Sequence, residues 1–184
     1  MKFTFFALAL ALSACAATPT LRYAVPPTTS DDKIRVSVRS VEVREVGLPL
    51  YAELETIAIE SPTGEVVVNK NLLWADDPIR AVTQGLADAL SSLTNAQVAA
   101  EPWPLSDGPD ARIEVRFSQA LALANGNYRM AGQYFVASIS GERREIARRF
   151  DISVPYATGS ASAIATAQGA AIIELARTIA KDGL

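Results

Sequence analysis

The sequence predicts a single α+β domain in which a mainly antiparallel sheet packs against two amphipathic helices. Stretches of alternating apolar and polar residues, typical of strands with one buried face, lie on both sides of residues 77–93. That segment and residues 160–181 instead carry apolar residues three or four apart, as a helix does. The length of 184 residues is ordinary for one domain, and no internal repeat indicates a second.

Residues 1–14 have the layout of a secretory signal peptide. Lys2 supplies a positive charge, residues 3–12 are apolar, and the small residues Ser13 and Ala14 precede a cysteine. The apolar run is about half of the ~20 residues that a membrane-spanning helix needs. We therefore expect a cleaved signal rather than a transmembrane anchor.

Cys15 is the expected site of lipid attachment. Residues 12–15 (Leu-Ser-Ala-Cys) resemble the bacterial lipobox, in which a diacylglyceryl group is joined to the cysteine sulfur before cleavage. The alternative is an ordinary signal that happens to contain the chain's only cysteine. A lipidated Cys15 leaves no free thiol and no disulfide in the mature chain. Ala16 is not the aspartate that the enterobacterial sorting rule associates with inner-membrane retention, so we expect the periplasmic face of the outer membrane.

The next segments predict a tether and then strands. Residues 15–32 contain Pro19, Pro26 and Pro27 and are expected to form a flexible tether, with Tyr23 and Val25 able to dock on the domain. The domain itself is expected to span residues 33–184. Apolar and polar residues alternate over residues 33–46 and again over residues 52–60, which predicts two strands. A third, short strand is expected at residues 65–68, after a Pro-Thr-Gly turn.

Residues 77–93 carry the clearest helix start in the chain. Asp77 is suited to cap the helix, and Pro78 is suited to its first position. The apolar face that follows consists of Ile79, Val82, Leu86, Leu90 and Leu93.

The remaining chain predicts a meander and a final helix. A short strand is expected at residues 97–103, and three more at 111–123, 128–139 and 145–154, the first two joined by an Asn125-Gly126 turn. The helix at residues 160–181 has more alanine than one buried stripe needs, so either the sheet or a second copy of the chain is expected to cover it.

The composition argues against several kinds of chemistry. The chain has no histidine, which removes the commonest general base and metal ligand, and a net charge of −3 does not favour nucleic acid. Glu53 and Glu55, two apart on an expected strand, favour a solvated face over a glycosidase pair. We expect no catalytic residues, no cofactor and no metal. The arginines at 143–144 and 148–149 indicate a solvated hairpin or, alternatively, a contact with lipid headgroups or an acidic partner.

Three aromatic residues near expected turns are candidate partner contacts. The default interpretation is that all three, Tyr51, Trp74 and Trp103, pack in the core or at an edge of the domain. Contact with another protein is the alternative, because tryptophan and tyrosine are enriched where interfaces bind most strongly.

The order of these features resembles the ABC-type transport auxiliary lipoproteins, which include PqiC-like subunits of membrane-integrity transporters. Residues 69–89 resemble the Asn-Leu-Trp-x-x-Pro stretch and following helix of that family, and residues 48–51, 113–115, 132–134, 149–155 and 174–180 continue the match. The chain departs from the pattern at residues 21–23, which hold one aromatic instead of two, and at Tyr134, where the family often has tryptophan.

The resemblance implies a non-catalytic component of a lipid-transport system. Its implied partners are an MCE-domain (PqiB-like) protein and inner-membrane transporter components, and the ring formed by MCE proteins would be met most easily by a homo-oligomer. A lipid-binding carrier with its own apolar pocket stays open as the alternative, because a pocket and a packed core look alike in a sequence.

Replacing the expected lipidation site gives a direct test. We predict that Cys15→Ser abolishes lipid attachment, because serine has no thiolate to alkylate. Metabolic labelling with a radioactive fatty acid measures this. A wild-type protein that takes up no label would contradict the lipoprotein interpretation.

Overall fold

The computed structural model describes residues 19–139, 141 and 144–184. It is an α+β domain, as the sequence predicts, and its sheet is mixed and mostly antiparallel. In chain order the elements are β1 (Leu21–Tyr23), β2 (Ser40–Val43), α1 (Leu50–Glu53), β3 (Thr56–Glu60), β4 (Val66–Trp74), α2 (Pro78–Leu93), β5 (Gln97–Ala100), β6 (Ala111–Ala122), β7 (Asn127–Ser138), β8 (Ile146–Pro155) and α3 (Ala161–Asp182).

The long strand β6 holds the sheet together. One of its edges pairs antiparallel with β7 along almost its whole length, and β7 pairs in turn with β8. Its other edge is divided between β2, which pairs in parallel with the start of β6, and β3, which meets its end at Ala122. Beyond these, β5 lies next to β2, β4 lies next to β3, and β1 lies next to β4.

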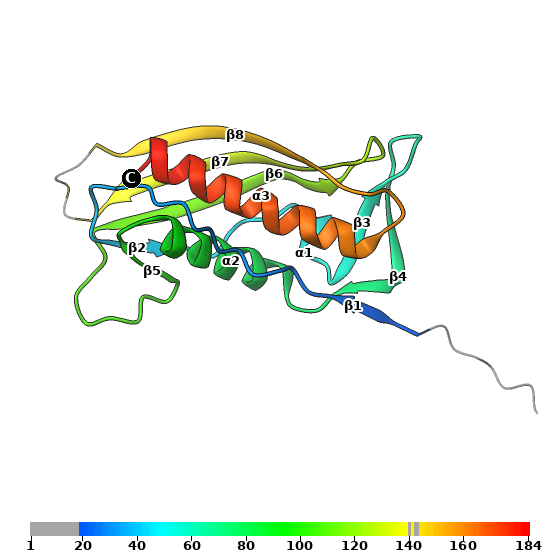
Figure 1. The fold of residues 1–184 in the computed structure, drawn as a ribbon, viewed down its shortest axis with the longest axis horizontal. Helices are drawn as coiled ribbons and strands as arrows, with labels where there is room; N and C mark the ends of the chain where they lie inside the picture. Colours follow the sequence, from blue (N-terminus) through cyan, green and yellow to red (C-terminus); the bar gives the residue numbers. More distant parts are fainter. Residues whose placement is uncertain (1–18, 140, 142–143) are drawn as a thin grey trace, which may run out of the picture.

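Helices α2 and α3 lie side by side on one face of the sheet (Figure 1). Asp77 caps α2 as predicted, because its Oδ1 accepts a hydrogen bond of 2.8 Å from the Arg80 N–H. Ser160 caps α3 in the same way through Ala163 N–H. The core between the layers includes these fully buried side chains: Leu86, Leu90, Leu93, Ile113, Met130, Ile164, Ile172, Leu175 and Ile179. No helix in the described part of the chain is long and apolar enough to cross a membrane.

The first half of the chain differs from the prediction. In the segment predicted as one strand, residues 33–46, only Ser40–Val43 is a strand, although Val36 and Val38 are buried. The Val36 N–H is bonded to the Asn95 side chain at 2.8 Å and not to a strand. The alternation of apolar and polar residues in this segment therefore indicates which side chains are buried. It does not indicate which backbone groups the segment pairs with.

The predicted strands at 52–60 and 65–68 also have different bounds. The first begins as the helical turn α1, which is a third helix that the sequence did not predict, and becomes β3 only at Thr56. The second continues to Trp74, because β3 and β1 both pair with its later residues.

The chain joins the folded domain at Leu21, inside the segment expected to be a tether. Residues Leu21–Tyr23 form β1, which pairs in parallel with Leu72–Trp74 of β4. Tyr23 and Val25 pack against the core, which is the docking that the sequence left open.

The alanines of α3 are used mainly inside the domain. Ala165, Ala167, Ala171, Ala176 and Ala180 are buried, whereas Ala163 is half-buried and Ala170 is exposed. The sheet and α2 therefore cover most of the alanine surface that the sequence left unexplained.

The buried face of α2 makes a prediction for stability. Leu86 has no exposed surface, so Leu86→Ala is expected to lower the free energy of unfolding by about 2–5 kcal/mol through lost burial and a residual cavity. Leu50→Ala is the matched control, because the Leu50 side chain is 77% exposed and should change stability little. Urea unfolding measures both, and equal effects would contradict the packing of α2.

Candidate functional site

After β1, residues 24–28 run along α2 beside α3, and we call this segment the strap (Figure 1). The Thr28 hydroxyl donates a hydrogen bond of 2.7 Å to the carbonyl oxygen of Gly85 in α2. On α3, a Cβ added to Gly169 would lie 3.2 Å from Val25 Cγ1, which is closer than side chains normally pack. Gly169 therefore lets the strap lie close to the backbone of α3.

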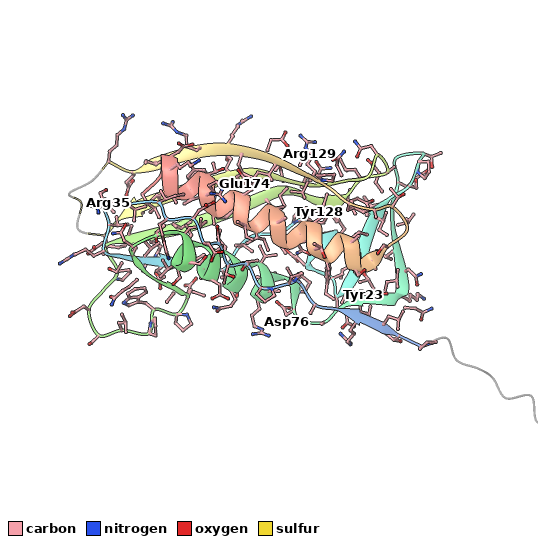
Figure 2. The ribbon with its side chains drawn as sticks, in the orientation of Figure 1. Tyr23, Arg35, Asp76, Tyr128, Arg129 and Glu174 are labelled. Atoms are coloured by element: carbon pink, nitrogen blue, oxygen red, sulfur yellow. The ribbon has the colours of Figure 1, made fainter. Side chains whose placement is uncertain are left out.

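A groove of about 210 Å³ opens between the strap, Trp74 and the first turns of α2. Its apolar lining includes Tyr23, Val25 and Pro78, and Gln168 of α3 also lines it. Two of its lining residues, Tyr23 and Asp76, are labelled in Figure 2. The groove is the place where the N-terminal segment and both helices meet.

Charged residues surround the mouth of this groove. Asp76, Arg80 and Asp88 line it, and Arg80 Nε donates to Asp76 Oδ1 at 3.1 Å. Hydrogen bonding from the Arg80 guanidinium lowers the pKa of the Asp76 carboxyl from its usual value. The pair is exposed, so its contribution to stability is small.

Two of the three predicted aromatic residues come together beside the groove. Tyr51 and Trp74 both line a second, smaller cavity of about 20 Å³, and Trp74 also lines the groove. Trp74 is only 8% exposed, and the Tyr51 hydroxyl accepts a hydrogen bond of 3.3 Å from Ala120 N–H. Both side chains are therefore mainly part of the packing between β4, α1 and β6.

Trp103 lies elsewhere, in the loop between β5 and β6. Its Nε1 donates to the Asp107 carbonyl at 2.6 Å, and its backbone N–H donates to Glu42 Oε1 at 3.2 Å. Glu42 is itself buried and paired with Arg112, its neighbour across the β2–β6 ladder. The side chain of Trp103, like that of Tyr51, keeps part of its surface accessible, and it lines neither the groove nor the smaller cavity.

The smaller cavity is lined by polar atoms that the sequence did not single out. Thr56 Oγ1 and Gln168 Oε1 line it, are buried, and have no hydrogen-bond partner within the described protein. Burial in the same cavity raises the pKa of the Tyr128 hydroxyl above its usual value. Nothing local marks these residues as special, since they come from β3, β7 and α3 and meet only in the folded chain.

The carboxylates considered for catalysis are not arranged as a pair. Glu53 ends the helical turn α1, and Glu55 forms an ion pair of 3.1 Å with Arg22, so the expected common strand face does not exist. Among the described residues, no group of three or more carboxylate or thiol side chains could hold a metal ion.

The expected basic patch is divided. Arg148 and Arg149 are neighbours on β8 and therefore point to opposite faces of the sheet. Arg143 and Cys15 lie outside the described residues.

A family model described as the ABC-type transport auxiliary lipoprotein component matches residues 20–180, almost the whole described domain. The chain belongs to this family. No curated protein matched the sequence of this auxiliary lipoprotein.

Solved structures show the same fold at low sequence identity. A crystal structure of an uncharacterized protein is 17% identical with a TM-score of 0.71, covering 88% of this chain and 97% of that one. Protein XCC0632 from Xanthomonas campestris is 16% identical with a TM-score of 0.69, covering 87% and 92% respectively. These two structures show the fold of the auxiliary lipoprotein. Its role as an auxiliary component of transport comes from the description of its family.

The contact between the strap and α3 can be tested. Gly169→Leu should push the strap away from α3, because a side chain there collides with Val25 and Pro26. Hydrogen exchange at the strap amides of Ala24, Val25 and Thr28 should become at least about ten-fold faster, which corresponds to ~1.4 kcal/mol of local stability; Pro26 and Pro27 have no N–H to exchange. Ala170→Leu is the control, because Ala170 is exposed on the next position of the same helix. Unchanged exchange in both variants would contradict the contact.

Proposed function

We propose that the protein is an outer-membrane lipoprotein, held at the periplasmic face by lipid on Cys15. We further propose that it acts as a non-catalytic auxiliary component of an MCE-type lipid-transport system that maintains the envelope. The observation that carries the proposal is the family match over residues 20–180, directly after a lipobox-like sequence.

The interior of the domain favours an interaction module over a lipid carrier. The space between sheet and helices is filled by the core, and the groove under the strap, at about 210 Å³, is smaller than the ~300 Å³ at which ligand pockets usually begin. A hollow of about 660 Å³ on β6–β8 is open to solvent and bordered by Arg116, Arg149 and Asp151. Neither resembles an enclosed acyl-chain site.

Partner recovery tests the proposal. Affinity purification of the lipidated full-length protein from membranes, followed by mass spectrometry, should recover an MCE-domain protein and inner-membrane transporter components. Trp103→Ala should reduce this recovery several-fold without lowering the melting temperature, because Trp103 is only partly buried in a loop. Trp74→Ala is a less useful probe, since Trp74 belongs to the core.

Two results would contradict this proposal. Recovery of no transport component from membranes would argue against the MCE system. Stoichiometric lipid bound to the delipidated domain would instead favour the carrier.

A homo-oligomer is also part of the proposal. The surface of α3 that remains for a second copy is centred on Ala163 and Ala170. Light scattering of the wild type and of a double variant with glutamate at both positions tests it, and a wild-type monomer at all reachable concentrations would overturn it.

A further inference from the structure

Three consecutive valines of β4 are exposed. Val66, Val67 and Val68 keep 43%, 49% and 48% of their surface accessible. Because successive side chains of a strand point to opposite faces, neither face of β4 is covered by the domain at this point. Leu21 of β1, 47% exposed and paired with Leu72, four residues beyond Val68 on β4, is a further exposed apolar side chain at this end of the molecule. We call these four residues the anchor-end patch.

One edge of β4 is also open beside the valines. On its inner edge, β3 pairs with Val66, Val67 and Val68. On its outer edge, β1 pairs only with Leu72–Trp74, so no described strand lies next to the valines there. The patch thus combines apolar side chains with an uncovered strand edge.

The patch lies at the end of the domain where the chain enters. Strand β1 runs parallel to β4 with Leu21 opposite Leu72, in the same strand as the valines and four residues after Val68. Figure 1 shows β1 and the β3–β4 hairpin at one end of the molecule and the C-terminus at the other.

Covalent geometry then limits the distance to the membrane. Cys15 stands six residues before Leu21, and six residues span at most about 20 Å when fully extended. An acyl chain on Cys15 sits in the bilayer, so Leu21 cannot lie farther than that from the lipid surface. The opposite end of the domain has no such restraint.

We propose that the anchor-end patch contacts the bilayer, so that β1 and β4 form a second, apolar attachment beside the lipid. The inference rests on the proposed lipid anchor at Cys15. Near the valines, β4 carries one basic side chain, Lys70, whereas the hairpin carries two acidic ones, Glu60 and Glu65. These charges do not favour anionic lipid, so burial of the valines drives the contact. The hydroxyls of Ser61 and Thr63 bond the Glu65 carboxylate, and the turn itself stays polar. The contact is therefore shallow.

A spin label at Val67 tests the contact in the mature lipidated protein. Cys15 is the only native cysteine, and its sulfur is blocked by the lipid, so Val67→Cys provides a unique labelling site. Ile139→Cys is the matched control, because Ile139 is 47% exposed and follows β7 at the opposite end of the domain. Both proteins are placed in phosphatidylethanolamine–phosphatidylcholine vesicles and recovered by flotation.

The measured quantity is the collision rate of each label with a water-soluble nickel complex and with oxygen, which concentrates in lipid. The Val67 label should collide several-fold less often with nickel, and more often with oxygen, than the Ile139 label. The difference should persist in high salt.

Three outcomes would overturn the inference. If both proteins float but their labels are equally accessible to nickel, the lipid anchor is supported and the contact of the patch with the bilayer is contradicted. If the proteins do not float, both the lipid anchor and the patch contact are contradicted. A Val67 label shielded from nickel and oxygen alike would show that protein, either a partner or a second copy, covers the strand.

Discussion

The fold depends on the backbone hydrogen bonds that β6 makes along both of its edges. One edge is occupied by β7, and the other is shared by β2, β3 and the intervening chain, whose Gly47 N–H bonds the Val115 carbonyl at 3.0 Å. Ile113 and Val115 have no exposed surface, so water cannot replace these bonds. Every other strand, and through them both helices, is positioned relative to β6.

The register around β6 depends on one glycine. Gly132 of β7 faces Phe117, and a Cβ there would lie 2.2 Å from the Arg116 carbonyl oxygen, which no side chain permits. The close approach coincides with an irregularity of β6 between Phe117 and Gln119. Phe117 and Phe150 are the neighbours of this glycine on the two adjacent strands, and their ring centroids are 5.4 Å apart, edge to face. The two rings therefore cover the backbone at Gly132, where a side chain is lacking.

The predictable parts of the structure are those with local causes. The Asp77-Pro78 start of α2 and the Asn125-Gly126 turn are encoded within a few residues, and both were predicted correctly. The sequence left docking of Tyr23 and Val25 open but did not predict the path of the strap, because Thr28 is held by Gly85, 57 residues away. Tyr51 and Trp74 could be selected as aromatics near turns, but their meeting with Gln168 depends on three separate elements and has no signal in the sequence.

The parallel pairing of β1 with β4 determines how the domain carries mechanical load. A pull on the N-terminus, away from the domain, acts along the strands and stretches the bonds of Leu21–Tyr23 together, in shear, rather than opening them one after another. The Arg22 side chain is tied to the Trp74 carbonyl at 3.0 Å and to Glu55, which shares the force with β3. Tension from a membrane anchor would therefore pass into the sheet before it reached the strap on α2 and α3.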